Sequence, residues 1–500
     1  MKRALRYTPD DNVLVALEDI RPGDSLEIDG KDCGIQAQAH VPLGHKIAAD
    51  EIPAGAAVVK FGHEIGFATE TIRSGDYVHV HNVRDAVGKW TGAKRTTYVP
   101  PTDTELPDSL LLREEPELMG YRRKNGYVGF RNHLLVISTV VCANQPVEEL
   151  GRKYRDIITI SNPTGCVILP NEVERLKSLL LGLARNPNVG AVIFCGLGCE
   201  AVEAEWYYDQ IKEEKPAAFV RIQSEGSCQS AEKKLEVYAR ELRAELDKQH
   251  REKVSVSDIR LGSKCGGSDW TTAAVANPVI GMVSDIVVKN GGISMQGETT
   301  GWFGAEDFFL KHARTEAVAD SILKLMNETY QKCESVGRRI EEGNPTPGNI
   351  EGGITTLAEK ALGNVKKGGS AIVEGTIDIG EYPPRKAGLY LANNPGLDPI
   401  SLIGLTSSGA NVLLYSTGRG SPVGTPVAPS IKITASPTAN QIFSAHMDLE
   451  LTNVTFGSER LEDGARRLFE EVISVCNGEL TKAEINGNRE VAFPLAVSPL

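Results

Sequence analysis

The N-terminal part of the chain has the pattern of short strands separated by turns. Apolar and β-branched residues gather in runs such as 12–17 and 25–28, and the turn-forming residues Pro22 and Gly23 lie between them. Short runs interrupted by turn signals about every ten residues are typical of all-β domains. The pattern therefore predicts a small all-β domain over residues 1–84.

A different pattern begins after residue 118, where strand-like and helix-like segments alternate. Residues 134–141 and 191–194 are apolar runs of the kind that form buried strands. Residues 173–183 and 231–249 carry apolar side chains at helical spacing instead. Alternation of this kind predicts βαβ units and largely parallel sheets.

Two stretches rich in proline or glycine divide the chain further. Residues 85–118 are polar and contain several prolines, which is typical of a semi-rigid linker. A second punctuated stretch at residues 343–353 predicts another boundary. We expect an α/β main body with largely parallel sheets in two subdomains, 119–340 and 341–500, after the all-β domain and the linker. Further strands are expected at 370–373, 388–391, 411–415 and 430–433.

Composition narrows the class of protein. The 500 residues are 41% hydrophobic and 24% charged, as in soluble globular proteins. Their apolar runs are shorter than the roughly 18 residues of a membrane span. The net charge of −12 disfavours binding to nucleic acid or an anionic membrane. Nine cysteines, an odd number, occur without a secretory signal pattern, so we expect reduced thiols and a cytoplasmic protein.

Four cysteines end apolar runs or stand beside glycine: Cys142, Cys166, Cys199 and Cys265. Open α/β sheets bind ligands where strands give way to loops, so we expect these thiols at one crevice. Three thiolates can hold an iron–sulfur cluster with one open iron. A single divalent iron bound by histidine and carboxylate is the competing arrangement. The alternative without a site is that each cysteine is a small buried hydrophobe.

The predicted β domain ends in a pair of histidines. His79 and His81 are two residues apart, so both imidazoles lie on one face of a strand. His45 and Lys46 stand in a turn context of the same domain. Paired imidazoles can bind a metal or act as acid and base. The alternative is that they are solvated polar side chains.

Polar residues of the α/β body complete the candidate site. Asp269 can bind a metal, orient a substrate hydroxyl, or cap the helix that begins at the next residue. Glu298 belongs to a glycine-containing loop that opens a helix, where carboxylates also occur for electrostatic reasons. Arg131 and Asn132 can pair with a substrate carboxylate or lie exposed at a strand edge. Arg419 stands between two glycines, in a turn that could hold an anion.

Several motifs follow one another along the chain, at residues 44–46, 79–82, 120–132, 196–200, 265–269, 276–278, 345–349 and 416–420. In these motifs the chain resembles the altronate/galactarate dehydratase family, and the resemblance covers nearly its whole length. The family implies that residues 1–84 form a β-clip module of the SAF type. It also implies a hydro-lyase that acts on six-carbon sugar acids and depends on iron or a similar divalent metal.

The resemblance assigns a metal site. The metal is expected as a ferrous ion or an iron–sulfur cluster, with manganese as another option. Cys142, Cys166 and Cys265 are the expected ligands, with Asp269 as a further candidate. Cys199 is expected nearby, in a structural position or on the substrate side.

The chemistry of a dehydration then leads to a hypothesis about acid–base and substrate-binding roles. A 2,3-dihydroxy acid loses the C2 proton and the C3 hydroxyl, which requires a base, an acid and a cation for the carboxylate. Lys46 or Arg131 is expected to hold that carboxylate. The expected catalytic residues are His45, Lys46, His79, His81 and Asp269. The expected substrate-binding residues are Arg131, Asn132, Glu298 and Arg419.

The expected partner is a small sugar acid, and self-association of the chain is also considered. The His-x-His-Asn sequence at 79–82 favours altronate, which loses water to give 2-keto-3-deoxygluconate. Residues 161–166 lack the family's histidine, and Trp270 replaces a small residue, so the substrate stays open. The alternatives are galactarate, another aldonic acid, or a sulfonated hydroxy acid cleaved by a sulfo-lyase. A non-catalytic sugar-acid sensor is the alternative outside enzymes, although a basic face for DNA is lacking.

Overall fold

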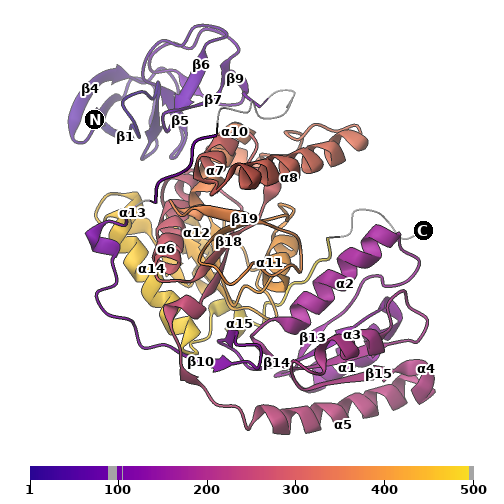
Figure 1. Cartoon of the computed structure of the whole chain (residues 1–500). Helices are drawn as coiled ribbons and strands as arrows, with labels where there is room; N and C mark the ends of the chain where they lie inside the picture. Colours follow the sequence, from indigo (N-terminus) through magenta and orange to yellow (C-terminus); the bar gives the residue numbers. More distant parts are fainter. Residues whose placement is uncertain (88–97, 104, 495–500) are drawn as a thin grey trace.

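The computed structural model describes residues 1–87, 98–103 and 105–494. Three regions follow one another along the chain: an N-terminal β domain, a middle α/β unit and a C-terminal α/β unit (Figure 1). Neighbouring strands in the main sheets of both α/β units are parallel. The predicted fold class, an α/β body preceded by a small all-β domain, is confirmed.

The N-terminal β domain consists of two sheets. The larger has the strand order β4-β3-β1-β2-β5-β8 and the smaller has the order β6-β7-β9. The strand runs expected at 12–17 and 25–28 are found as β2 and β3. The strands of the larger sheet are β1 Lys2–Leu5, β2 Val13–Ala16, β3 Ser25–Ile28, β4 Lys31–Gln36, β5 Lys46–Ala48 and β8 Tyr77–Val78. Those of the smaller sheet are β6 Ala57–Lys60, β7 His63–Ala68 and β9 Val83–Asp85.

The middle unit is a parallel sheet of order β13-β12-β14-β15 with helices on both faces. Side chains alternate along β12 and β14, so one set packs against α1 and α5 and the other against α2 and α3. The strands are β12 His133–Ser138, β13 Ile158–Ile160, β14 Val189–Gly196 and β15 Ala217–Arg221. The helices are α1 Asn144–Lys153, α2 Pro170–Arg185, α3 Ala204–Ile211, α4 Ile222–Glu225 and α5 Cys228–Leu246.

The C-terminal unit is built on a parallel sheet of order β19-β20-β18-β17-β21-β22-β23. Helices α6 and α14 cover one face, and α11 packs on the other. The strands are β17 Arg260–Gly266, β18 Ile293–Gln296, β19 Val373–Ile377, β20 Gly388–Ala392, β21 Val412–Thr417, β22 Ser430–Thr434 and β23 Leu449–Glu450. The helices are α6 Asn277–Lys289, α7 Glu306–His312, α8 Glu316–Ser335, α9 Pro347–Glu351, α10 Leu357–Val365, α11 Asp398–Ser407, α12 Pro437–Phe443, α13 Thr452–Thr455, α14 Leu461–Cys476 and α15 Lys482–Asn486.

The boundary expected between residues 340 and 341 falls inside this sheet. Strands β17 and β18 precede it, yet they pair with β21 and β20, which follow it. The observed division comes earlier, after α5 and a small sheet of order β11-β10-β16. The apolar pattern does not reveal β17 and β18, because serine, lysine and glutamine interrupt them. The small sheet consists of β10 Met119–Arg122, β11 Val128–Gly129 and β16 Glu252–Lys253.

The expected linker at 85–118 lies partly outside the described residues. Within its described part, the structure has the end of β9 and a turn of 3₁₀ helix at Asp108–Leu110. One helical stretch of the described chain, Thr272–Lys289, is long and apolar enough to cross a membrane, but 67% of it is buried inside the protein. It packs between the seven-stranded sheet and α14, which is the position of a core helix.

Two buried ion pairs join the β domain to the C-terminal unit. The Nζ atom of Lys46 lies 2.9 Å from Oε2 of Glu359, and that of Lys60 lies 2.7 Å from Oε1. Burial alone would raise the pKa of Glu359, but the two ammonium charges lower it to about 2. The carboxylate is therefore ionised near neutral pH. An apolar cluster that includes Ile52 and Ile65 of the β domain and Leu357 of α10 surrounds this contact.

We expect Glu359→Gln to destabilise the protein by about 3–5 kcal/mol, because it leaves two buried ammonium groups without their carboxylate. Unfolding in urea, followed by tryptophan fluorescence, measures the change. Glu174→Gln is the matched control, since Glu174 pairs with Lys177 while 70% of its side chain is exposed. The control should stay within about 0.5 kcal/mol of wild type. Equal stability of both variants would contradict the docking role of Glu359.

Candidate active site

The seven-stranded sheet has a topological switch point at β17. From β17 the chain moves to β18 on one side, and it later returns to the other side of β17 as β21. The connections that leave β17 and β21 diverge, and open α/β sheets bind ligands at such carboxyl ends. We call residues 266–269 and 417–419, which begin at the last residues of these two strands, the strand-end site.

The β domain brings imidazoles next to the strand-end site. His45 Nε2 lies 3.0 Å from the backbone oxygen of Glu351, and His79 Nδ1 lies 3.2 Å from Oγ1 of Thr355. The centres of the two imidazole rings are 4.9 Å apart. The backbone N–H of Trp270 donates to the oxygen of Gly352, so the segment that holds the imidazoles contacts the strand-end site directly.

The two buried histidines, His45 and His79, differ in which ring nitrogens make hydrogen bonds. A carbonyl only accepts, so His45 Nε2 carries a proton and Nδ1 accepts from the Tyr77 hydroxyl at 2.7 Å. Burial lowers the pKa of His45, which keeps this ring neutral. Burial and then the charge of Lys46 lower the pKa of His79 to about 3. Among the hydrogen bonds of the described residues, none occupies Nε2 of His79, so a neutral imidazole nitrogen is free there.

His81 and Lys46 differ in their access to a ligand. His81 is exposed, with its ring centre 5.2 Å from that of Tyr77. Lys46 is fully buried, and its Nζ donates to Glu359 and, at 2.8 Å, to the backbone oxygen of Gly353. The prediction that Lys46 holds a substrate carboxylate does not agree with these contacts. Lys46 instead docks the β domain and lowers the pKa of His79.

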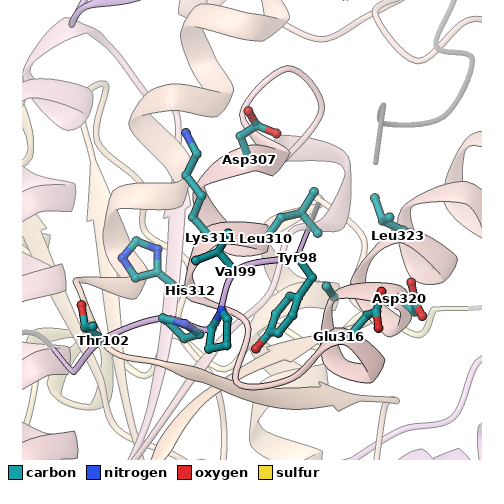
Figure 2. Close-up of a pocket in the computed structure, with 13 residues that line it drawn as sticks. Tyr98, Val99, Thr102, Asp307, Leu310, Lys311, His312, Glu316, Asp320 and Leu323 are labelled. Atoms are coloured by element: carbon teal, nitrogen blue, oxygen red, sulfur yellow. The ribbon is translucent and has the colours of Figure 1, made fainter. Parts of the chain in front are cut away.

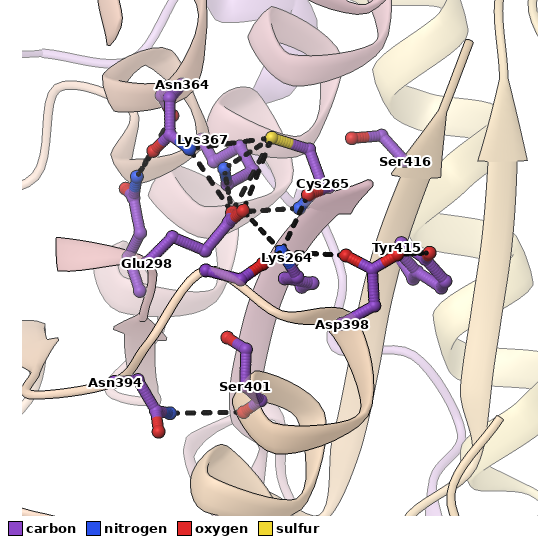
Figure 3. Close-up of polar contacts among 12 residues, drawn as sticks. Lys264, Cys265, Glu298, Asn364, Lys367, Asn394, Asp398, Ser401, Tyr415 and Ser416 are labelled. Carbon is purple, nitrogen blue, oxygen red and sulfur yellow. Dashed lines mark hydrogen bonds and ion pairs between the residues drawn. The ribbon is translucent and has the colours of Figure 1, made fainter. Parts of the chain in front are cut away.

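A buried cluster of charges lies at the ends of β17 and β18 (Figure 3). Oε2 of Glu298 lies 2.7 Å from Nζ of Lys367, and Oε1 lies 2.5 Å from Nζ of Lys264. The Lys367 Nζ is also 3.0 Å from Sγ of Cys265. A carboxylate oxygen of Asp398 lies 3.0 Å from Lys264. Two ammonium groups and two carboxylates therefore balance one another around a buried thiol.

Glu298 is the centre of this cluster. Burial alone would raise its pKa, but the charges of Lys264 and Lys367 lower it to about 2. The backbone of Glu298 has a φ of +72°, a left-handed conformation that is uncommon outside glycine. Such strain is often retained at functional sites. The position agrees with the predicted site loop, although the buried ion pairs leave Glu298 no free edge for a substrate.

Asp269 and Arg419 belong to the two segments of the strand-end site, which the bond from the Arg419 backbone N–H to the Gly267 oxygen holds together. Oδ1 of Asp269 accepts from the backbone N–H of Thr272 at 3.0 Å, so the carboxylate caps the helical segment after it. A Cβ atom at position 418 would lie 2.1 Å from this oxygen, which explains Gly418. The Arg419 guanidinium pairs with Glu351 at 2.7 Å while 41% of its side chain is exposed. Arg419 is therefore the cation of this site that solvent reaches.

Arg131 and Asn132 lie elsewhere. The guanidinium of Arg131 binds the Glu484 carboxylate at 2.7 Å and donates to the backbone oxygens of Val475 and Glu479. The Asn132 side chain accepts from Arg123 and donates to a backbone oxygen of α5. Both residues join units at the amino end of the middle sheet. The prediction that they bind substrate does not agree with these contacts.

The structure does not bring the expected metal triad together. Cys142 and Cys166 follow β12 and β13 of the middle sheet, whereas Cys265 belongs to β17 of the other sheet. Asn188 precedes β14 and donates to the backbone oxygen of Asn411, which precedes β21. The two sheets therefore meet at their amino ends, and their carboxyl ends point apart. Within the described residues, no three His, Cys, Asp or Glu side chains are grouped to hold one metal ion. The side chains do not fit a single iron or manganese ion in this triad, and no reaction step below is assigned to one.

Several residues of the candidate site were missed in the sequence. Lys264 carried a usable signal, because a lysine inside a strand before a glycine-rich turn must find a partner when the strand is buried. Glu359, Lys367 and Asn364 lie on or just after α10, about one hundred residues further along the chain than Lys264. Their helix has an ordinary amphipathic pattern, so only the fold shows that they face the same site.

One cavity of the described structure lies away from this chemistry. It has a volume of about 630 Å³ and lies between α7, α8 and the segment at 98–102 (Figure 2). Lys311, His312 and Glu316 line it, but none of the predicted site residues does. The cavity is therefore not part of the candidate active site.

An N-terminal β domain with imidazoles beside the strand ends of an α/β body is an arrangement that can support acid–base chemistry. Three family models match the chain in succession. They are the altronate/galactarate dehydratase SAF domain at residues 2–86, the D-galactarate dehydratase/altronate hydrolase second domain at 120–247, and the D-galactarate/altronate dehydratase C-terminal domain at 256–497. The chain belongs to the altronate/galactarate dehydratase family. It is a lyase, a hydro-lyase of sugar acids.

Relatives of known activity match nearly the whole chain. An altronate dehydratase of Bacillus subtilis is 31% identical over 99% of both chains, and one of Escherichia coli is 31% identical over 97% of both. The β subunit of a (2R)-sulfolactate sulfo-lyase of Chromohalobacter salexigens is 30% identical, over 74% of this chain and 95% of its own length. The resemblance stated for the sequence is confirmed.

The low pKa of Glu298 makes the protein acid-sensitive. A carboxylate with a folded pKa of about 2, against an ordinary 4.5, stabilises the folded state above pH 4.5. That contribution, about 3 kcal/mol, is lost as the pH falls from 4.5 towards 2. We expect Glu298→Gln to have a lower free energy of unfolding than wild type at pH 7. Between pH 4.5 and 2 it should lose less of that free energy than wild type, because only Glu359 of the two buried carboxylates is left to take up a proton. Urea unfolding midpoints measured between pH 4.5 and 2 test this expectation. In the control Glu174→Gln, the midpoint should depend on pH as strongly as in wild type. Parallel curves for Glu298→Gln and wild type would contradict the low pKa.

Proposed function

We propose that this protein dehydrates D-altronate to 2-keto-3-deoxygluconate at the strand-end site. The observation that carries the proposal is that one segment, residues 351–355, contacts both the imidazoles and the exposed cation. His79, whose Nε2 is free, bonds to Thr355, and His45 bonds to the backbone oxygen of Glu351. The carboxylate of Glu351 pairs with Arg419. The proposal is supported by two relatives named altronate dehydratase that match almost end to end. The His79-x-His81-Asn82 sequence favours the same substrate.

The proposed reaction needs three groups. Arg419 holds the C1 carboxylate, since its guanidinium is charged and reachable. His79 Nε2 removes the C2 proton, and the electron pair forms the C2–C3 double bond as the C3 hydroxyl leaves. His81, on the open side of the Tyr77 ring, gives that hydroxyl a proton, and water departs. The enol then becomes the 2-keto acid by taking a proton at C3 and releasing the proton of its C2 hydroxyl to water.

The low pKa of His79 fits this order of events. An imidazole with a pKa of about 3 is neutral at pH 7 and can accept a proton, but it is a weak base. A bound carboxylate adds a negative charge near the ring, which raises the pKa of His79. Substrate binding thus strengthens the base. His45, with both nitrogens bonded, positions Tyr77 and the segment at Glu351 rather than transferring a proton.

A cytoplasmic location is part of the proposal. All nine cysteines are free thiols in the structure, including the exposed Cys142 and Cys199. Free exposed thiols persist in a reducing compartment.

A sulfo-lyase is the second candidate. A sulfonated hydroxy acid loses its C2 proton and expels sulfite from C3 in the same way that altronate loses water. This candidate is favoured by the relative named (2R)-sulfolactate sulfo-lyase, whose β subunit is 30% identical over 74% of this chain. A 44-residue match to the α subunit of that enzyme supports the same candidate.

The substrate can be decided by a panel. We expect purified protein, supplied with ferrous iron without oxygen, to convert D-altronate to a 2-keto-3-deoxy acid detected as its semicarbazone. Galactarate, other aldonic acids and (2R)-sulfolactate are the comparison substrates, with free sulfite measured for the last. Sulfite release that exceeds the altronate rate would replace the proposal by the second candidate. Binding of altronate without turnover of any acid would indicate a sensor.

His79→Ala should lower kcat by about 10²–10⁴-fold, the usual contribution of a positioned base. The KM for altronate should change less, because Arg419 still holds the carboxylate. His63→Ala is the matched control, since His63 is an exposed histidine of the same domain. A His79→Ala enzyme with near-wild-type kcat would contradict the assigned role.

A further inference from the structure

A second cavity, rich in cations, lies where the middle unit meets the small sheet β11-β10-β16. It has a volume of about 440 Å³, and its lining comes from β10, the start of β14 and the segments after α3 and α5. Two of the lining residues are glutamates, and five are cations: Arg122, Arg123, Lys124, Lys212 and Lys215. The whole chain carries a net charge of −12, so this excess of positive charge is a local feature.

Two of these cations are buried without a carboxylate partner. Arg123 is 9% exposed and Lys215 is 8% exposed. Arg122 pairs with Glu252, and Lys212 pairs with an aspartate of α3. No ion pair within the described residues joins Arg123, Lys215 or the exposed Lys124 to an acidic side chain. A cation that is removed from water without a counter-charge is costly, so this pair of buried cations needs an explanation.

Both buried cations hold the same turn before β14. Nε of Arg123 donates to the backbone oxygen of Pro187 at 2.7 Å. Nζ of Lys215 donates to the oxygens of Asn186 at 3.1 Å and Val189 at 2.8 Å. An ammonium group has three N–H donors, so one donor of Lys215 is left over beside the cavity. The carbonyl oxygens supply partial charges only, and the full positive charges stay unbalanced.

The electrostatics of the two cations agree with a missing counter-charge. Burial, and then the charge of Arg123, lower the pKa of Lys215 well below its usual range. Glu214 acts in the opposite direction, but it pairs with Arg185 at 2.8 Å. Burial also lowers the pKa of Arg123 to about 10. An anion in the cavity would stabilise the charged form of both side chains.

We propose that this cavity binds a small molecule through a phosphate group. Guanidinium and ammonium groups are the usual protein partners of phosphate. A phosphate monoester carries nearly two negative charges at neutral pH, against one for a carboxylate, so it offsets the cations better. The volume lies within the range of small-molecule sites, about 300–1,000 Å³. Tyr121 and Pro216 also line the cavity and offer apolar surface to the rest of the ligand.

The site is separate from the proposed dehydration. None of the residues of the strand-end site, and none of the histidines beside it, lines this cavity. The turn that its cations hold also joins the two α/β units, because Nδ2 of Asn186 donates to the backbone oxygens of Thr406 and Ala410 at 2.8 and 2.9 Å. A ligand bound to Arg123 and Lys215 therefore braces this junction.

The test measures binding to the full-length protein after phosphate has been dialysed away. Isothermal titration with inorganic phosphate, glycerol 3-phosphate and glycerate compares the phosphate group with a carboxylate of similar size. We expect both phosphate compounds to bind with a Kd below about 1 mM. Glycerol 3-phosphate should bind at least about tenfold more tightly than glycerate, and it should raise the midpoint of thermal unfolding. Absence of saturable binding, or equal affinity for glycerate, would overturn the proposal.

Variants locate the binding. Lys215→Met should weaken the binding of glycerol 3-phosphate about tenfold or more, and Lys124→Gln should weaken it several-fold. Lys153→Gln is the matched control, since Lys153 lies on α1 of the same unit and pairs with Glu236 while 51% of its side chain is exposed. Arg419→Ala should bind like wild type, which excludes binding at the strand-end site.

Circular dichroism identifies any variant that fails to fold. If Lys215→Met does not fold, the comparison of Lys124→Gln with Lys153→Gln decides, because both change an exposed lysine. Wild-type affinity in the folded cavity variants, or loss of binding in Arg419→Ala, would contradict a phosphate site in this cavity.

Discussion

The contact between the β domain and the C-terminal unit is centred on one buried carboxylate. Glu359 receives Lys46 and Lys60 from the β domain, in a region where an unpaired charge would be costly. Each of these charges is tolerable only while the two parts are in contact, so the ion pairs select one docked arrangement. That arrangement brings His45 and His79 onto the segment after α9. The acid–base groups of one domain are thereby fixed to the sheet of another.

The charge of Lys46, which docks the β domain, also influences the pKa of the proposed base. Lys46 is pinned by Glu359, yet its charge reaches His79 and helps burial to lower the pKa of that imidazole. A docking contact thus keeps the proposed base neutral until an anionic substrate arrives. Binding and base strength are coupled through one electrostatic field, without any movement of the backbone. The bonded ring of His45 supports this arrangement by leaving His79 as the buried imidazole with a free nitrogen.

Patterns along the chain predicted what depends on local periodicity. Strands β2, β3, β12 and β14 and helices α2 and α5 follow from apolar spacing. The prediction that His79 and His81 share one face of a strand was wrong, because β8 ends at Val78 and both residues lie in the turn after it, with His79 buried and His81 exposed. Strands β17 and β18 were missed because their buried positions hold polar side chains that serve the site. Arg131 was misjudged because a guanidinium that binds a carboxylate in the protein has the same sequence signal as one that binds a substrate. The buried partners on α10 have no local signal at all.

The cysteines show where a correct local rule fails when it is applied to the whole chain. Cys142, Cys166 and Cys199 do lie in the loops after β12, β13 and β14, and Cys265 lies in the last residues of β17. The rule says nothing about which sheet a strand joins. Asn188 and Arg131 hold the amino end of the middle sheet against the C-terminal unit, so the two carboxyl ends face apart. One expected crevice therefore becomes two, a strand-end site that meets the imidazoles of the β domain and a thiol-bearing edge. Any cooperation between them must pass through the contact at their amino ends or through a second molecule.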